Sequence, residues 1–473
     1  MTDVVSKLWG FCHTLRHDGI GYSHYVEQLT YLLFLKMAGE REIVLPRSTD
    51  WLHLRSLSGT DLLDAYVEAL RLLGKQPGML GDIFSGAQSR FSNPVNLQRL
   101  IALIDETEWT SLDVDVKAAA FEGLLEKAAS EGKKGAGQYF TPRLLIKAIV
   151  RLMQPDPRVS RDFKIDDPAC GTGGFLVASY EWLLQETKGA LDRDAAKRIR
   201  TQTYFGQDID PEPRRLAVMN LYLHQVEPHI DRKDSIYETP SPNRYDVILT
   251  NPPFGTRGAN QAPERDDFTV STSNKQLNFL QHVLTILKPG GRAAVVVPDN
   301  VLFADQAGEV FRVLTEDCEL HTVLRLPRGT FSPYSEGTKT NVIFFTKGHP
   351  TQRTWIFDAR AGVPKITKKD RPLTADHFAE FERCFGADPN GRARRSERDS
   401  GNNRWRSFSI EDIKSRDYKI ESLKWLHDDE FDEVDDTGDP EELLGQVADT
   451  LSAAQARISE LRRSIVGGVM NDD

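Results

Sequence analysis

The sequence is poor in cysteine and contains no long apolar run. Its four cysteines lie far apart and form no C-x-x-C pair (Cys12, Cys170, Cys318 and Cys384), so neither a zinc site nor a disulfide framework is expected. No stretch approaches the roughly 18 apolar residues that a membrane helix requires, and the first residues lack the basic and apolar regions of a secretory signal. We therefore expect a cytoplasmic protein without a metal site or membrane contact.

Two kinds of motif are also missing. There is no G-x-x-x-x-G-K-[ST] run, so ATP hydrolysis is not expected, and no zinc-finger or helix-turn-helix signature for reading a DNA sequence is present. The net charge is −10, from 60 basic and 70 acidic residues, but residues 428–442 alone hold ten acidic residues and no Lys or Arg. Because the rest of the chain is balanced, the acidic net charge does not exclude an anionic partner.

The pattern of apolar residues divides the chain into regions. Residues 1–134 show helical spacing at 24–42, 61–73, 95–106 and 115–130, which predicts an all-helical domain. In residues 135–425, amphipathic segments alternate with short apolar runs at 163–166, 203–207, 246–250, 292–297, 322–326 and 341–346. This alternation predicts an α/β fold with a parallel sheet and helices on both faces. Ligands then bind beyond the carboxyl ends of the strands.

Residues 426–473 contain the acidic run and then a heptad pattern. Apolar residues recur at spacings of three and four (Leu444, Val447, Leu451, Ala454, Ile458, Leu461 and Ile465). Such a seam predicts a helix that forms a coiled coil or bundle with a partner. Packing against the body of this chain is the alternative, and the acidic run is expected to be a solvated linker.

A glycine-rich segment follows the first predicted strand and opens a helix. Residues 166–174 read D-D-P-A-C-G-T-G-G, and the glycines allow a tight turn that a ligand can approach closely. The dinucleotide pattern G-x-G-x-x-G is absent, and an acidic residue here suits an amine or sulfonium better than a pyrophosphate. Candidate ligand-binding residues are therefore Asp167, Gly171, Thr172, Gly173 and Gly174, although a purely structural turn would share this pattern.

An acidic residue also ends the second predicted strand. In G-Q-D-I-D, residues 206–210, Asp208 is placed to accept hydrogen bonds from two ribose hydroxyls. Asp210 precedes Pro211 and is expected to cap the next helix. The alternative is that both acids merely start that helix.

The most specific feature is Asn251-Pro252-Pro253-Phe254, directly after the predicted strand at 246–250. Two prolines end the strand and stiffen the turn, so the Asn251 amide oxygen and the Pro252 carbonyl can accept both hydrogens of one NH₂ group. Holding those hydrogens out of the plane of a conjugated ring restores lone-pair density on the nitrogen. Phe254 offers a face on which a base can stack, worth roughly 1–3 kcal/mol.

Together, the glycine-rich segment and the N-P-P-F tetrad resemble those of amino-group DNA methyltransferases that use S-adenosyl-L-methionine. The resemblance implies a Rossmann-like core with a mostly parallel, seven-stranded sheet. It implies that the glycine-rich loop binds the methionine part of the cofactor, and that Asn251, Pro252, Pro253 and Phe254 act on N6 of adenine. Cytosine-N4 enzymes more often carry Ser at the first position of the tetrad.

Residues 135–143, G-A-G-Q-Y-F-T-P-R, sharpen the resemblance to the modification (M) subunits of type I restriction–modification systems. Residues 299–303 and 326–331 match the same subfamily. Departures are small, since Asp208 stands where Glu is common and Cys170 fills a small-residue position.

The resemblance also assigns roles to single residues. Thr141 and Pro142 are expected at the N-cap and first position of a helix, and Phe331 and Tyr334 are expected to help Phe254 receive the target base. Further residues are expected to bind the cofactor together with Asn251 (Gln138, Tyr139, Phe140, Thr141, Pro142, Arg143 and Asp234).

The implied substrate is a flipped-out adenine in double-stranded DNA, with sequence specificity supplied by a separate specificity (S) subunit. The C-terminal helix is the expected docking element, with two M subunits for each S subunit, and a restriction (R) subunit remains open. Alternatives are a protein-glutamine N5 methyltransferase, an rRNA guanine-N2 methyltransferase, or a cofactor-binding scaffold without activity.

The heptad pattern yields a first prediction. Deleting residues 444–473 should leave cofactor binding intact and abolish assembly with the S subunit, because the deletion removes the apolar seam. Co-purification of the truncated and full-length chains with the S subunit measures this, and unchanged recovery would contradict the docking role.

Overall fold

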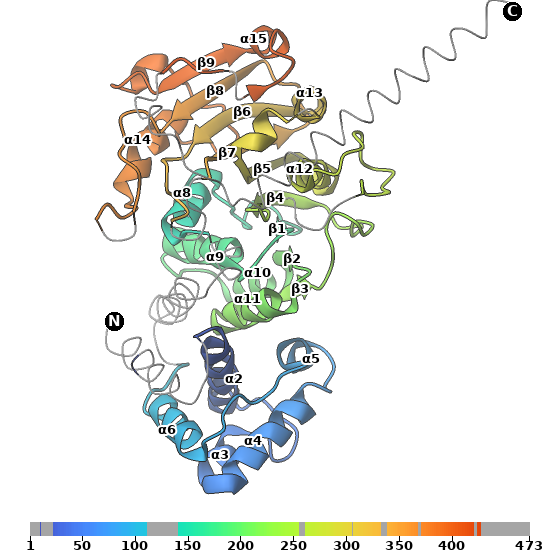
Figure 1. Ribbon diagram of the computed structural model, residues 1–473, viewed down its shortest axis with the longest axis vertical. Coiled ribbons are helices and arrows are strands. Elements are labelled where there is room, and N and C mark those ends of the chain that lie inside the picture. Colours follow the sequence, from blue (N-terminus) through green and yellow to red (C-terminus); the bar gives the residue numbers. More distant parts are fainter. Residues whose placement is uncertain are drawn as a thin grey trace, which may run out of the picture.

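The protein combines a three-layer α/β structure with a group of helices at one end (Figure 1). This computed structural model describes residues 10, 22–110, 141–254, 261–304, 306–332, 338–367, 370–420 and 423–426. The predicted helix at 115–130 and the heptad seam at 444–465 lie outside the described residues, as do Gln138, Tyr139, Phe140 and Tyr334. Across those described ranges, no helix is both long and apolar enough to cross a membrane.

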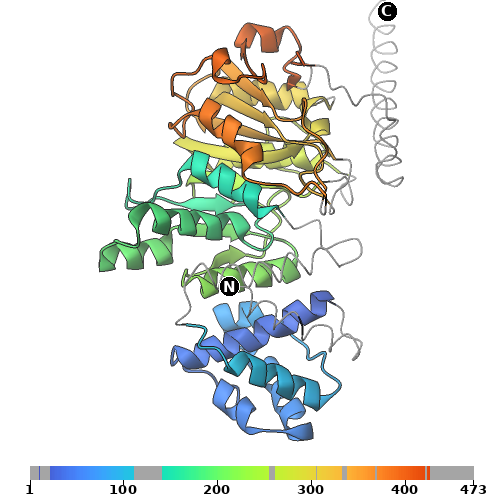
Figure 2. The same ribbon diagram turned by 90° about the vertical axis from the view of Figure 1, so that its left-hand side faces the viewer.

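The helices at the N-terminal end confirm three of the sequence-based expectations. They are α2 (Tyr22–Glu40), α3 (Trp51–Ser56), α4 (Gly59–Leu73), α5 (Met79–Phe84) and α6 (Pro94–Asp105). The pattern did not predict α3 and α5, which have six residues each and are too short to show helical periodicity. These helices pack beneath α11 (Pro211–Leu223), as Figures 1 and 2 both show, and Arg214 of α11 pairs with Asp82 of α5 at 2.8 Å.

One nine-stranded sheet forms the middle layer, in the order β3-β2-β1-β4-β5-β7-β6-β8-β9. The first five strands in this order are parallel, whereas β7 runs antiparallel between β5 and β6, and β9 is antiparallel to β8. The strands are β1 (Ile165–Asp167), β2 (Tyr204–Gln207), β3 (His229–Asp231), β4 (Tyr245–Thr250), β5 (Leu287–Pro298), β6 (Cys318–Arg325), β7 (Thr340–Lys347), β8 (Arg353–Asp358) and β9 (Trp405–Ser409).

The fold class is confirmed, but the prediction of seven strands is wrong because β8 and β9 extend the sheet beyond β6. β9 follows a polar segment, residues 388–404, that reads as a loop in the sequence. Arg395 fixes this segment, since its guanidinium donates to the Phe385 carbonyl at 2.9 Å and to the Thr322 hydroxyl at 2.9 Å. Trp405 then stacks on Trp355 of β8 with ring centroids 4.9 Å apart.

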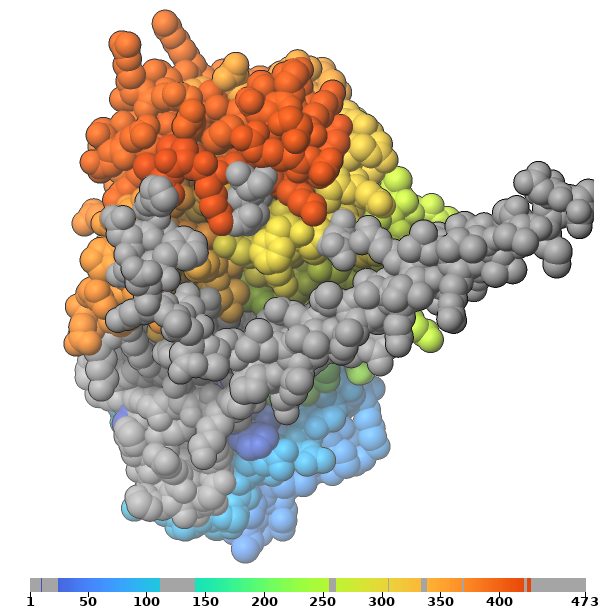
Figure 3. All heavy atoms as spheres, turned by 45° about the horizontal axis from the view of Figure 1, so that its top comes forward, coloured from blue at the N-terminus to red at the C-terminus, as the bar shows by residue number. Residues whose placement is uncertain are grey.

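Helices cover both faces of the sheet. One face carries α8 (Arg143–Met153), α9 (Gly174–Thr187), α10 (Arg193–Gln202), α11 and α14 (Asp376–Phe385), and its core continues into α2–α6. The other carries α12 (Lys275–Ile286), α13 (Ala307–Asp317) and α15 (Ile410–Lys414). Successive side chains of β5 point to opposite faces of the sheet and so pack into different hydrophobic cores. Ala294 and Val296 belong to the core under α8–α11 and α14, and Ala293 and Val295 to the core under α12, α13 and α15. Figure 3 shows the C-terminal strands and helices (orange and red) at the end opposite the N-terminal helices (blue).

A buried arginine joins the segments that follow β5 and β6. Arg360 lies after β8, and its side chain is 8% exposed. Its guanidinium pairs with both carboxylate oxygens of Asp299, at 2.6 and 2.8 Å, and donates to the carbonyls of Leu326 at 3.3 Å and Thr340 at 3.0 Å. Asp299 begins the 3₁₀ helix η2 (Asp299–Leu302). Burial works to raise the pKa of Asp299, but Arg360 outweighs it, and that pKa lies below its usual value.

We predict that Arg360→Met lowers the free energy of unfolding by about 3 kcal/mol, because the variant leaves the Asp299 carboxylate within the protein without its positively charged partner. The matched control is Arg312→Met on α13, which breaks a pair with Glu316 whose side chains are 46% and 55% exposed. An exposed pair of this kind contributes at most about 0.5 kcal/mol. Urea unfolding of both variants measures the difference, and equal losses would contradict a structural role for Arg360.

Candidate active site

The candidate site lies where β1 pairs with β2 on one side and β4 on the other. All three strands are parallel, with Asp167 opposite Gly206 of β2 and Asp166 opposite Ile248 of β4. Their carboxyl ends therefore meet at one edge of the sheet, at the point where the strand order reverses. The segments that leave these three ends carry the glycine-rich turn, Asp208 and the N-P-P-F tetrad.

The glycine-rich turn needs glycine at two positions. Gly171 has φ of 51° and Gly173 has φ of 77°, a left-handed conformation that costs most residues energy. A Cβ on Gly173 would also lie 3.3 Å from the Cβ of Ala217. The turn is fixed by the Cys170 amide, which donates to the Gln207 carbonyl at 2.9 Å, and by Asn220, which donates to the Thr172 carbonyl at 3.1 Å.

Asp208 faces this turn. Its Oδ2 accepts from the Gly171 amide at 3.0 Å and its Oδ1 from the Asp210 amide at 2.9 Å. One amide on each oxygen leaves further lone pairs for a ligand. Burial raises the pKa of Asp208 to about 6, although both amides act to lower it. Asp210 caps α11 by accepting from the Glu212 amide, with Pro211 at the first position, so its predicted capping role is confirmed.

Neighbouring carboxylates of β1 have different surroundings. Asp167 is 2% exposed and accepts from the Ala169 amide at 3.1 Å, and burial raises its pKa to about 7. Asp166 is fully buried and accepts from the Gln207 side chain at 3.0 Å, and burial raises its pKa well above the usual value. Successive strand residues point to opposite faces, and Asp167, the last residue of β1, is the carboxylate next to the glycine-rich turn.

Asp234 lies in a turn at the same edge. Its Oδ1 accepts from the amides of Ile236 at 2.9 Å and Tyr237 at 3.1 Å. The next residue, Ser235, donates its hydroxyl to the Pro168 carbonyl at 2.6 Å, which ties this turn to the glycine-rich segment. The Asp208 amide in turn donates to the Asp231 carbonyl at 3.1 Å. The structure thus brings Asp167, Asp208 and Asp234 to one edge.

The tetrad is held from both sides. The Asn251 side chain donates from Nδ2 to the Thr141 hydroxyl at 2.9 Å, and Gln276 of α12 donates to the Pro253 carbonyl at 3.2 Å. The Asn251 oxygen, Oδ1, is buried and has no hydrogen-bond partner among the described residues. A buried acceptor of this kind is costly unless a ligand satisfies it, so this oxygen is available to a substrate donor.

The expected capping role of Thr141 and Pro142 is wrong by one residue. Pro142 is itself the N-cap of α8, without a side-chain bond, and its carbonyl accepts from the Ile146 amide at 3.0 Å. The Thr141 hydroxyl instead accepts from Asn251. Arg143, predicted to bind the cofactor, places its guanidinium 2.7 Å from the Glu181 carboxylate on α9.

Phe254 and Phe331 come together although 77 residues separate their positions in the numbering. Their ring centroids are 5.5 Å apart at an interplanar angle of 80°, the edge-to-face arrangement that aromatic pairs favour. Phe331 is 3% exposed, whereas Phe254 is partly buried. We call this pair, which includes the last residue of the tetrad, the aromatic wall.

Gln276 and Ser235 were not predicted as positioning residues. The polar run at the start of α12, where Asn274 caps the helix with bonds to the amides of Gln276 and Leu277, is the signal available for Gln276. Nothing local in the sequence indicates that the Ser235 hydroxyl reaches Pro168. The described residues contain no group of three or more His, Cys, Asp or Glu side chains that could hold a metal.

Comparisons with known proteins agree with this geometry. The model of the N-6 DNA Methylase family matches residues 112–433, more than half of the chain. Two curated relatives are the methylase subunits of the type I restriction enzymes StySPI from Salmonella potsdam and EcoKI from Escherichia coli strain K12. Each is 36% identical to this chain over 98% of its length and 96% of the relative's.

Solved structures give the same result. The crystal structure of the EcoKI M protein is 32% identical, with a TM-score of 0.56, and covers 98% of this chain and 96% of that one. A chain from a structural study of type I R-M complex assembly is 27% identical, with a TM-score of 0.76, over 98% of both chains. The chain therefore belongs to the N-6 DNA methylase family, among the methylase subunits of type I restriction enzymes.

Proposed function

We propose that this chain transfers the methyl group of S-adenosyl-L-methionine to N6 of a flipped-out adenine in double-stranded DNA, as the M subunit of a type I restriction–modification system. One observation carries the proposal. The Asn251 oxygen is buried at the end of β4 with no partner among the described residues, while Thr141 holds the amide nitrogen. An amide oriented in this way accepts a hydrogen from an exocyclic amino group.

The residues at the strand ends fit this cofactor. Asp208 retains lone pairs for two ribose hydroxyls, and Asp234, in a turn at the same edge, is proposed for the adenine side. The tight turn that Gly171 and Gly173 form is proposed to hold the methionine part, and the Asp167 carboxylate suits its ammonium group. When bound, the cofactor supplies an electrophilic methyl on a sulfonium. Thr172, Pro142 and Arg143 complete the proposed set, together with Gln138, Tyr139 and Phe140.

The tetrad prepares the nucleophile. Asn251 Oδ1 and the Pro252 carbonyl accept one hydrogen each from the N6 amino group and hold them out of the ring plane, so the nitrogen lone pair points at the methyl. The Pro253 carbonyl is already bonded to Gln276 and serves to fix the turn. After transfer, the extra proton on nitrogen leaves to water. Positioning supplies most of the rate enhancement in such a step.

The adenine must leave the helix to reach Asn251, at a cost of a few kcal/mol. The aromatic wall of Phe254 and Phe331 offsets part of this cost, because base stacking on an aromatic side chain contributes roughly 1–3 kcal/mol. Tyr334 is proposed as a third member of this wall.

We assign three regions to this function. Residues 1–134 form a helical domain, 135–425 the catalytic domain and 426–473 the linker and docking helix for an S subunit. Two M subunits would bind each S subunit, in the cytoplasm, with an R subunit as a further partner. The relatives are methylase subunits of type I restriction enzymes, which supports assembly with other subunits.

Long-read sequencing that detects modified bases tests the function directly. DNA from cells with the chain and its S subunit should carry a two-part N6-methyladenine motif that disappears when the chain is deleted. Unchanged methylation would contradict the proposal and favour a protein or RNA substrate.

Asn251→Ala should lower methyl transfer at least about a hundredfold, since removing one preorganised hydrogen-bonding group costs that much in comparable sites. Cofactor affinity should change by less than about threefold, because Asn251 is only one of the many residues proposed to contact the cofactor. Tritium transfer to DNA and calorimetric titration measure the two effects. Asn402→Ala, in an exposed turn, is the control, and transfer at the wild-type rate by the Asn251 variant would refute the tetrad assignment.

Cofactor affinity should fall as the pH drops below about 7. Burial raises the pKa of Asp167 to about 7, so its ionised form, which attracts the cofactor's ammonium, becomes scarce below that pH. The loss should approach tenfold for each pH unit below the pKa. Titrations from pH 8 to 5.5 measure it.

Asp167→Asn should bind more weakly at pH 8 and lose the decrease that begins near pH 7, keeping only a decrease near pH 6 that comes from Asp208. Asp162→Asn, at an exposed site, should behave like the wild type. A wild-type affinity that stays constant down to pH 5.5 would show that Asp167 does not contact the cofactor.

A further inference from the structure

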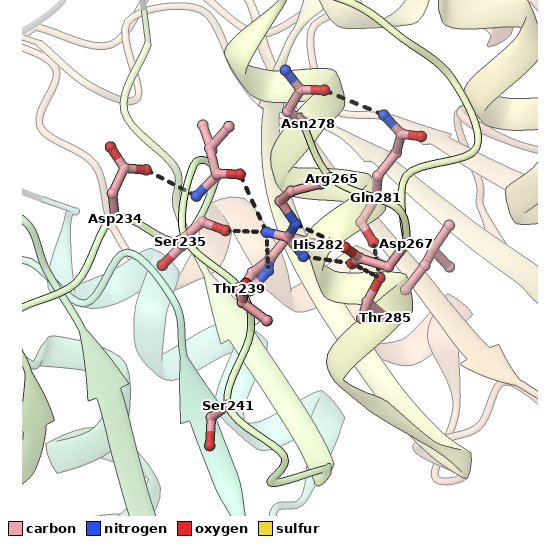
Figure 4. Close-up of polar contacts among 12 residues, drawn as sticks. Asp234, Ser235, Thr239, Ser241, Arg265, Asp267, Asn278, Gln281, His282 and Thr285 are labelled. Carbon is pink, nitrogen blue, oxygen red and sulfur yellow. Dashed lines mark hydrogen bonds and ion pairs between the residues drawn. The ribbon is translucent and has the colours of Figure 1, made fainter. Parts of the chain in front are cut away.

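A buried arginine connects the turn that carries Asp234 to the helix that follows the tetrad in the sequence. Arg265 belongs to the connection from β4 to α12, and its side chain is 3% exposed. Nη1 donates to the carbonyls of Ser235 at 2.6 Å and Ile236 at 3.3 Å, and lies 3.1 Å from Nδ1 of His282 on α12 (Figure 4). This one nitrogen thus joins the turn that carries Asp234 to the helix α12.

The opposite side of the guanidinium is also satisfied. Nε and Nη2 pair with the two oxygens of Asp267 at 2.9 and 2.5 Å, and the Thr285 hydroxyl of α12 donates to the same carboxylate at 2.6 Å. The guanidinium lies 4.0 Å from the ring centroid of Phe268. Each of the three guanidinium nitrogens therefore has a hydrogen-bond partner, which stabilises a single orientation of the Arg265 side chain.

His282 acts as an acceptor in this cluster. It is 4% exposed, and burial, reinforced by Arg265, lowers its pKa to about 3. The ring is therefore neutral near pH 7. Because the arginine can only donate, Nδ1 carries no proton. A neutral imidazole here binds the cation without repelling it.

Both ends of the cluster reach the proposed site. The Ser235 hydroxyl donates to Pro168 in the glycine-rich segment at 2.6 Å, and the neighbouring Asp234 is the proposed adenine-side residue. At the other end, the first turn of α12 carries Gln276, which holds the Pro253 carbonyl of the tetrad at 3.2 Å. Arg265 thus links two parts of the site that are distant in the sequence.

We propose that Arg265 is a positioning residue for cofactor binding, which fixes the turn at 234–236 against α12 and so holds the adenosine side of the site at a set distance from the N-P-P-F tetrad. This inference rests on the proposed cofactor site and adds a residue to it. Arg265 acts through the two carbonyls and does not itself contact the cofactor.

Calorimetric titration of the full chain with two ligands tests the proposal. S-adenosyl-L-methionine probes the whole site, and 5′-methylthioadenosine probes the adenosine side without the amino acid. Arg265→Met should weaken both by the same factor, roughly tenfold, because the variant loses every donor to the turn. Arg312→Met on α13, an exposed arginine, is the matched control and should bind like the wild type.

Steady-state kinetics with the S subunit and DNA separate positioning from general damage. The KM for the cofactor should rise by about the same factor, while kcat at saturating cofactor should fall by less. A lower kcat with unchanged affinities would overturn the proposal, as would a loss confined to S-adenosyl-L-methionine, since that would place the effect at the methionine end.

Arg265→Lys provides a second variant should the methionine variant fail to fold. Lysine keeps the charge and one donor for Ser235 but cannot make the forked pair with Asp267, so its affinities should lie between those of the wild type and the tenfold loss. Unchanged affinities for this variant would overturn the proposal.

Asp208→Asn, titrated in parallel, tests the proposed cofactor site separately from the positioning role of Arg265. If it binds the cofactor normally, the proposed site itself is wrong. If it binds weakly while both Arg265 variants bind normally, only the positioning role fails.

Discussion

The pairing of β1 with both β2 and β4 is the constraint on which the site depends. Three parallel strands bonded side by side end at one edge, so the segments that follow them must share a small volume. The site can then be assembled from short turns that are joined by hydrogen bonds between side chains and backbone groups. The Gly171 amide on Asp208 and the Ser235 hydroxyl on Pro168 are two such bonds, and each joins the ends of different strands.

Two buried arginines fix the positions of loops that the strands alone do not hold in place. Arg265 lies on the proposed cofactor side and acts through Ser235 and His282, whereas Arg360 bonds to Asp299 and to Leu326 in the segment that leads to Phe331. In both places a guanidinium pairs with an aspartate and uses its remaining donors on backbone carbonyls of another segment. Five donors in a rigid, planar group suit this task better than the single ammonium of lysine. The loops are thus held by charge-assisted bonds as well as by packing.

The sequence predicted the groups that lie within one motif and missed those that act across the fold. The glycine-rich turn and the tetrad are short segments at strand ends, so their local pattern was enough to predict where they lie. Arg265 and Arg360 sit in polar segments and look like surface residues, because their partners Ser235 and Asp299 are 30 and 61 positions away. β9 was missed for the same reason, since it follows a polar stretch that Arg395 anchors from a distance. The helix α8 starts one residue later than predicted, and the Thr141 hydroxyl accepts from Asn251 instead of capping the helix.

The proline that follows Asn251 also bears on the chemical lifetime of the protein. Asparagine usually loses its amide by cyclisation, in which the backbone nitrogen of the next residue attacks the side-chain carbonyl. The nitrogen of Pro252 carries no hydrogen and is locked in a ring, so this route to a succinimide is closed. Thr141 further restrains the amide by accepting from its nitrogen at 2.9 Å. The same proline that stiffens the turn therefore also protects the Asn251 amide from conversion to a charged carboxylate.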